Sequence, residues 1–154
     1  MPQLKTILLT TDFSENAQAS VPYAVELARK FGGSIRLVYV FEESNLAVGM
    51  PGEGAIVYDW INAARIERKV RLIALAEEFA KAERLDVAPI FLEGTAATEI
   101  LNAAKTNQAD CIVIATHGRT GLSHFVSGSV AERVVRLSPC PVLTIRPEKM
   151  KQRT

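Results

Sequence analysis

The sequence predicts one α/β domain built on an open, five-stranded parallel sheet with helices on both faces. Three observations predict it. Short apolar runs alternate with longer segments of helical periodicity along the whole chain, which is the pattern of β-α-β crossovers. A chain of 154 residues suits one domain with its own core. No repeat, low-complexity segment or linker divides it, so we expect one domain over 1–147 and a frayed tail over 148–154.

The first strand is predicted at 5–11, where a continuous apolar run indicates burial on both faces. Ser14 is a good N-cap for a helix that we expect to continue through Phe31. Pro22 falls inside that helix, where a proline removes one backbone hydrogen bond and bends the chain. We therefore expect a single bent helix here.

Glycines at 32–33 should end this helix, and a second strand is predicted at 34–41. Residues 42–58 then contain glycine and proline without periodicity, which predicts one long irregular loop. This loop either closes over a ligand or binds a partner, and its residues do not decide between the two.

A long helix is predicted over 59–84 with two neighbouring apolar seams that together form a broad buried stripe. Trp60, at its start, is expected to be a packing anchor, because buried aromatic area usually belongs to the core. The seams are Ile66, Val70 and Ile73, and Leu72, Ala76 and Phe79.

The remaining elements follow the same alternation. A third strand is predicted at 87–92, a helix capped by Thr95 follows it, and a fourth strand is predicted at 111–116. The last helix is defined by Val130, Val134 and Leu137 and stopped at Ser138 and Pro139, and the fifth strand is predicted at 141–147.

Prolines predict the order of the strands. Pro89 interrupts the third strand, while Pro141 and Pro147 bracket the fifth. Proline cannot donate to a hydrogen-bond ladder, so these two strands belong at the edges of the sheet and the order is 3-2-1-4-5. The chain then reverses direction between strands one and four, and ligands of open α/β sheets bind at such a switch point. Residues 10–12 and 115–118 should meet there.

The glycine-rich stretch 115–130 after strand four admits three interpretations. Gly118, Gly128 and Ser129, at a helix start, suit an anion such as phosphate. Alternatively, the glycines only form turns and Ser129 only caps the helix. Catalysis by His117 or His124 is the third interpretation, but no GxSxG or HExxH motif accompanies them, and neither a P-loop nor GxGxxG is present.

Composition limits the classes of partner and location. The formal net charge of +1 gives no global field toward nucleic acid or an anionic membrane. The apolar runs are too short for a membrane span, and Asp12 closes the first one, so we expect no signal peptide and a cytoplasmic location. The two cysteines are expected to be reduced and mostly buried.

Two blocks of the sequence resemble the universal stress protein family. They are "KTILLTTDFSENAQASVPYAVELARKFGGSIRLVYVFE" and "ADCIVIATHGRTGLSHFVSGSVAERVVRLSPCPVLTIRP". The resemblance implies an adenine-nucleotide alpha-hydrolase-like fold with the strand order above. Its ATP-binding subclass carries G-x2-G-x9-G-[ST]; Gly118, Gly128 and Ser129 match the later part, and Ala115 replaces the first glycine.

The resemblance also implies which residues contact ATP, or AMP or ADP in its place. Residues 10–12 would line the adenosine, with Asp12 near the ribose or adenine or on a Mg²⁺ ion, and Val40 would contact the adenine. The residues implied for the adenosine, ribose and phosphates are Thr10, Thr11, Asp12, Val40, Ala115, His117, Gly118, Arg119, Gly128, Ser129 and Val130.

The function implied is that of a cytosolic ATP-binding homodimer, paired through strand 141–146, that regulates or senses stress with slow or no hydrolysis. An apolar free edge strand is a template for such pairing. Two alternatives stay open: an ATPase or phosphoryl-transfer enzyme, and an interaction module that binds no nucleotide. The regulatory protein partner is not identified by the sequence.

Overall fold

The computed structural model describes residues 3–44, 54–116 and 129–147. Within these ranges it contains one five-stranded sheet in the order β3-β2-β1-β4-β5, and every adjacent pair of strands is parallel. The predicted fold class and strand order are confirmed. The elements are β1 (Thr6–Thr10), α1 (Glu15–Gln18), α2 (Val21–Phe31), β2 (Ser34–Phe41), α4 (Ala55–Glu83), β3 (Val87–Glu93), α5 (Ala96–Thr106), β4 (Cys111–Ala115), α6 (Val130–Leu137) and β5 (Val142–Ile145).

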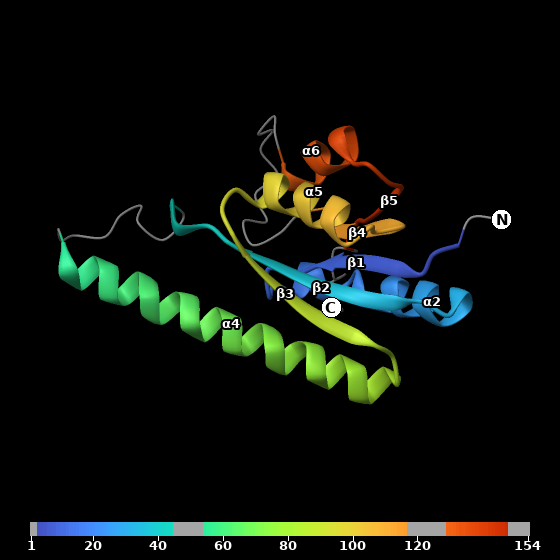
Figure 1. Ribbon diagram of the computed structural model, residues 1–154, viewed down its shortest axis with the longest axis horizontal. Coiled ribbons are helices and arrows are strands. Elements are labelled where there is room, and N and C mark those ends of the chain that lie inside the picture. The colour runs from blue at the N-terminus through green and yellow to red at the C-terminus, as the bar shows by residue number, and fades with distance from the viewer. Residues whose placement is uncertain (1–2, 45–53, 117–128, 148–154) are drawn as a thin grey trace, which may run out of the picture.

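Helices cover both faces of the sheet, with α2 and α4 on one face and α5 and α6 on the other (Figure 1). Successive residues of a strand point to opposite faces. Ile7 and Leu9 of β1 therefore pack with α2 and α4, while Leu8 packs with α5 and α6, and all three side chains are fully buried. Burial on both faces explains the continuous apolar run in this strand.

The segment after β1 forms two helices, so the prediction of one bent helix was wrong. The Ser14 hydroxyl accepts the Ala17 N–H at 3.1 Å and caps α1, as predicted. Pro22 lies in the first turn of α2, where an N–H has no intrahelical partner and its loss costs little. The buried Ser20 joins the two helices, and its hydroxyl donates to the Ala17 carbonyl at 2.6 Å.

Two glycines follow α2, and each is needed for a different reason. Gly32 is the C-cap and has a left-handed φ of 61°, which glycine adopts without steric cost. At Gly33 a Cβ atom would lie 2.5 Å from the Leu4 carbonyl oxygen. The chain can therefore enter β2 closely alongside the residues that precede β1.

Helix α4 begins at Ala55, four residues before the predicted 59, so the end of the predicted 42–58 loop is helical. Residues 45–53 of that loop lie outside the described residues. Leu72 and Ala76 are buried against the sheet, and Phe79 packs on the same core, as predicted.

The other predicted seam of α4, formed by Ile66, Val70 and Ile73, is not buried. Ile66, Val70 and Ile73 are 64%, 61% and 41% exposed, because a helix turns only one side toward the sheet. Trp60 is 43% exposed and is not a core anchor. Figure 1 shows α4 running along the sheet and continuing past it at its N-terminal end, where Trp60 lies in sequence.

The last two helices bury narrow faces. Ile100, Leu101 and Ala104 of α5 are buried as predicted. In α6, Val134 is buried with Ala131; Val130 and Leu137, by contrast, are 39% and 51% exposed, so they do not form the predicted apolar face. None of the helices in the described part of the chain combines the length and the apolar character needed to cross a bilayer.

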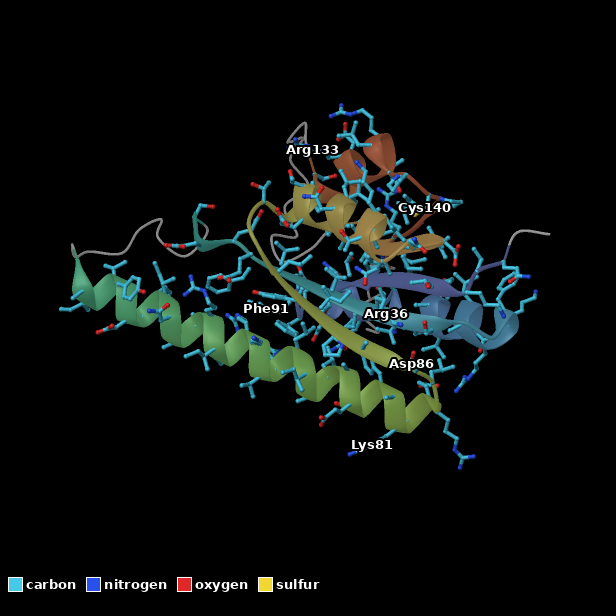
Figure 2. All side chains as sticks on the ribbon, viewed as in Figure 1. Arg36, Lys81, Asp86, Phe91, Arg133 and Cys140 are labelled. Atoms are coloured by element: carbon cyan, nitrogen blue, oxygen red, sulfur yellow. The ribbon has the colours of Figure 1, made fainter. Side chains whose placement is uncertain are left out.

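Both edges of the sheet agree with the proline argument. Pro89 lies in edge strand β3 opposite Leu37, and β5 follows Pro141 at the other edge. Cys111 in β4 is buried, Cys140 before β5 is partly buried, and both are free thiols, as predicted. Cys140 lies on the α5 and α6 side of the sheet (Figure 2), whereas Cys111 belongs to the opposite core.

Candidate functional site

The candidate site lies where β1 and β4 end side by side. These strands are parallel, and Leu9 pairs with Val113. Two residues further along, this register brings Thr11 level with Ala115. Thr10 is almost completely buried as the last residue of β1, and the Thr11 N–H donates to the Val38 carbonyl at 2.9 Å. The topology therefore brings together the two strand ends that the sequence predicts for the switch point.

The turn after β1 is held by its own side chains. The Thr11 hydroxyl oxygen accepts the Phe13 N–H at 3.0 Å. The Asp12 Oδ1 atom accepts both the Ser14 N–H, at 2.9 Å, and the Ser14 hydroxyl, and Ser14 in turn caps α1. This Asx turn fixes the Asp12 carboxylate at the edge of the switch point.

Ala115 has ordinary strand geometry. It is the last residue of β4 and pairs with Ile145, and among the described non-glycine residues only Phe13, Arg84 and Gln108 have positive φ. Extended backbone is open to any residue, so this position does not require glycine for its conformation. The remaining effect of alanine is the volume of one methyl group beside the switch point.

On the β4 side, a hollow of about 360 Å³ connects the strand end with the start of α6. Thr116, Ser129 and Thr144 are among its lining residues. Ser129 is the N-cap of α6, and its hydroxyl oxygen accepts the Glu132 N–H at 3.1 Å. A helix start supplies backbone N–H groups that have no partner within the helix and the positive end of the helix dipole.

Thr144 is the residue that sequence reasoning missed on this side, while Thr116 was predicted at the switch point within 115–118 but not among the nucleotide contacts. The Thr116 N–H donates to the Ile145 carbonyl at 2.8 Å, which continues the ladder beyond β4. A threonine in a strand pattern carries no signal of a binding role, because threonine is a common strand residue.

Of the predicted site residues, seven are described by the structure and four are not. Val40 lies in β2, the strand next to β1, opposite Leu92, and packs on the α5 and α6 side of the sheet. Val130 opens α6 next to Ser129. His117, Gly118, Arg119 and Gly128 lie outside the described residues.

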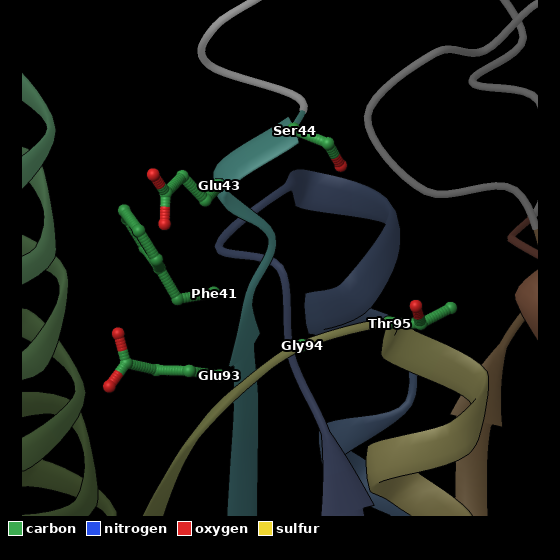
Figure 3. A pocket seen from close by; sticks show the side chains of 6 residues that line it. All are labelled: Phe41, Glu43, Ser44, Glu93, Gly94 and Thr95. Atoms are coloured by element: carbon green, nitrogen blue, oxygen red, sulfur yellow. The ribbon is translucent and has the colours of Figure 1, made fainter. Parts of the chain in front are cut away.

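A second hollow, of about 410 Å³, lies at the ends of β2 and β3 beside the start of α5. Figure 3 shows Glu43 and Glu93 pointing toward α4 with Phe41 between them. Arg65 of α4 forms ion pairs with both glutamates and lies 5.4 Å from the centroid of the Phe41 ring. Both acidic side chains of this hollow are thus paired with the same arginine of the protein.

The start of α5 is occupied by a side chain of the protein. The Glu42 carboxylate accepts the Ala96 N–H at 2.5 Å, while Thr95, the N-cap residue, makes no side-chain capping bond. The prediction of Thr95 as the N-cap is right in position, but the capping contact comes from Glu42. In the described ranges no three His, Cys, Asp or Glu side chains gather as a metal site.

Sequence comparison identifies the family. The model of the universal stress protein family matches residues 3–146. The chain belongs to the universal stress protein family. A universal stress protein of Methanocaldococcus jannaschii is 33% identical over 147 residues, which cover 94% of this chain and 84% of that protein. One from Thermus aquaticus is 32% identical over 142 residues, covering 92% and 98% of the two chains.

Solved structures of universal stress proteins share the fold. UspA from Lactobacillus plantarum superposes with a TM-score of 0.77 at 24% identity, covering 94% of this chain and 99% of its own. A universal stress protein in complex with cAMP has a TM-score of 0.66 at 22% identity and covers 94% and 98%. One from Archaeoglobus fulgidus in complex with dAMP has a TM-score of 0.61 at 21% identity and covers 94% and 99%.

Proposed function

We propose that this universal stress protein binds an adenine nucleotide, ATP in the first place, at the switch point between β1 and β4. The observation that carries the proposal is the meeting of two strand ends: residues 10–12 on one side, and Thr116 and Ser129 lining one hollow on the other. Solved universal stress proteins of this fold in complex with cAMP and with dAMP support the choice of an adenine nucleotide.

The adenosine is assigned to the β1 side. Thr10 and Thr11 offer hydroxyl and backbone groups, and the carboxylate of Asp12, held by Ser14, suits a ribose hydroxyl or the adenine amino group. Val40, near the end of β2, supplies an apolar contact for the adenine. Alternatively, the Asp12 carboxylate would hold the Mg²⁺ that accompanies ATP, since Mg²⁺ binds through one or two carboxylates plus phosphate oxygens.

The phosphates are assigned to the β4 side. Backbone N–H groups at the start of α6 and the Ser129 hydroxyl suit an anion, and the hydroxyl keeps its proton for donation while its oxygen accepts from Glu132. The residues proposed for the ribose and phosphates are Ala115, His117, Gly118, Arg119, Gly128, Ser129 and Val130.

Calorimetric titration with ATP and AMP tests this assignment. The variant Gly128→Arg is expected to lose nucleotide binding and to keep its fold, because an arginine side chain fills the phosphate side. Ala82→Arg, at an exposed position of α4, adds the same side chain elsewhere and should bind like the parent. Unchanged ATP affinity in Gly128→Arg would show that the phosphate assignment is wrong.

We propose further that the nucleotide state works as a switch or sensor, with slow or no hydrolysis. Phosphate release in the presence of Mg²⁺, with Asp12→Ala as the control, measures this directly. Turnover at or above about 1 s⁻¹, the low end of ordinary enzymes, would instead favour an ATPase or phosphoryl-transfer enzyme.

A homodimer through strand β5 is part of the proposal. The Pro141 and Ile145 carbonyls accept hydrogen bonds from β4, so the alternate residues Val142 and Thr144 turn their backbone groups toward the free edge. Thr144→Pro removes an outward N–H while sparing the ladder with β4. We expect this variant to be monomeric by sedimentation and still folded; a dimer of unchanged stability would place the interface elsewhere.

The exposed face of α4 favours a second candidate, an interaction module. Ile66, Val70 and Ile73 form an apolar row on a helix surface, and such patches often bind proteins. Absence of ATP and AMP binding at millimolar concentration would select this candidate. In either case we propose a cytoplasmic single domain over 1–147 with the tail 148–154 outside it, acting through a regulatory protein partner.

A further inference from the structure

The turn that carries Asp12 contains strained backbone. Phe13 has a φ of 63°, a left-handed conformation that is unfavourable for a large side chain. Two hydrogen bonds flank this residue in the turn, from the Phe13 N–H to Thr11 and from the Ser14 N–H to Asp12. The orientation of the Asp12 carboxylate therefore depends on Phe13 staying where it is.

Ring contacts hold Phe13 in place. Its ring stacks on Tyr39 with centroids 4.7 Å apart and planes inclined by 24°. Tyr39 stacks in turn on Phe91 at 5.8 Å. Phe91 belongs to β3 (Figure 2) and packs on the same core as α4. The guanidinium carbon of Arg71, from α4, lies 4.4 Å from the centroid of the Phe13 ring. Stacked rings and a cation over an aromatic face both stabilise such an arrangement.

We infer that Phe13 and Arg71 are positioning residues for the nucleotide site. Through the Arg71–Phe13 contact, α4 keeps the turn 11–14 in the conformation that presents Asp12 at the switch point. This inference rests on the proposed function, because it takes the switch point as the nucleotide site. Arg71 is itself an exposed residue of α4, so a partner that binds α4 and moves Arg71 would change nucleotide affinity.

Titration of arginine variants with ATP tests the link. Arg71→Met keeps the aliphatic stem and removes the cation, and Arg71→Lys keeps a cation. The matched control is Arg65→Met, which removes an arginine of the same helix from another ring, Phe41. We expect Arg71→Met to weaken ATP binding about two- to fivefold, Arg71→Lys to recover part of it, and Arg65→Met to bind like the parent. Equal effects of Arg71→Met and Arg65→Met, or none from Arg71→Met, would overturn the inference.

Amide hydrogen exchange of the ligand-free protein separates this inference from the proposed function. Arg71→Met should speed exchange at the Phe13 and Ser14 amides and leave that of Leu9, in buried β1, unchanged. Unchanged exchange at Phe13 and Ser14 would refute the link, even if ATP binds. If the parent protein binds neither ATP nor AMP, the proposed function fails, while faster exchange in Arg71→Met would still support the link between α4 and the turn.

Discussion

Helix α4 has an inner and an outer apolar face, and only the inner face is buried. Leu72 and Ala76 are 0% and 1% exposed, whereas Val70 and Ile73 are 61% and 41% exposed. Both faces carry apolar residues at helical spacing. Periodicity therefore identifies the helix and its apolar sides, but distant strands decide which side is covered. Contacts, rather than residue type, separate positions that look equivalent in sequence.

The largest expected effect is on the free energy of unfolding, and it separates two neighbouring residues on the two faces of α4. Leu72→Ala should lower the free energy of unfolding by about 2–5 kcal/mol, because it opens a cavity in a closely packed core. Ile73→Ala, one residue along, should change it by no more than about 0.5 kcal/mol. Denaturant unfolding of the two variants measures both values. Equal losses would mean that the outer face is packed within the folded protein.

A smaller effect contrasts two helix starts. Ser129→Ala removes the hydroxyl that accepts the Glu132 N–H and should cost about 1 kcal/mol in ligand-free protein. Thr95→Ala should cost much less, because Thr95 makes no capping bond and Glu42 holds the Ala96 N–H instead. Thermal unfolding of both variants checks the ranking, and a larger loss for Thr95→Ala would reverse it.

Ala115 offers a contrast with the first glycine of the pattern G-x2-G-x9-G-[ST]. Because the residue has strand geometry, Ala115→Gly should change ATP affinity by less than about fourfold, the equivalent of one methylene group. Calorimetric titration of this variant beside the parent measures it. A gain of a hundredfold would show that the methyl group blocks the nucleotide.

The last contrast is between the two cysteines, and it concerns the reactivity of their thiols. Burial, followed by the neighbouring Cys140, raises the pKa of the Cys111 thiol, and the thiolate is the reactive form. Cys140 is partly exposed, so alkylation near neutral pH should modify Cys140 first and leave Cys111 intact in the folded protein. Peptide mass mapping over time distinguishes the two sites, and faster labelling of Cys111 would contradict its burial.

Much of the fold could be predicted from the sequence because it depends on local signals. Continuous apolar runs marked the strands, and Pro89 and Pro141 marked the two edge strands, which gave the order. The boundary at Pro22 was missed because proline suits a helix start as well as a bend. The exposed face of α4 was missed because burial depends on the sheet as a whole.

The candidate site was predictable where topology alone decides it. The ends of β1 and β4 were located through the strand order, which led to Asp12 and Ala115. The contact between Phe13 and Arg71 joins residues far apart in sequence, and no motif marks it. The cap that Glu42 provides for α5 was missed for the same reason.

That cap has a consequence for where a polyanion can settle. Helices α5 and α6 both begin beyond the ends of parallel strands, so both starts attract negative charge. At α5 the protein's own Glu42 carboxylate already neutralises this attraction, and Glu43 and Glu93 lie beside it. At α6 a neutral serine caps the helix, with Glu132 in the first turn, so that start carries no carboxylate on its cap. We therefore expect a polyanion to be disfavoured at α5 relative to α6, because the start of α5 already binds a carboxylate of the protein.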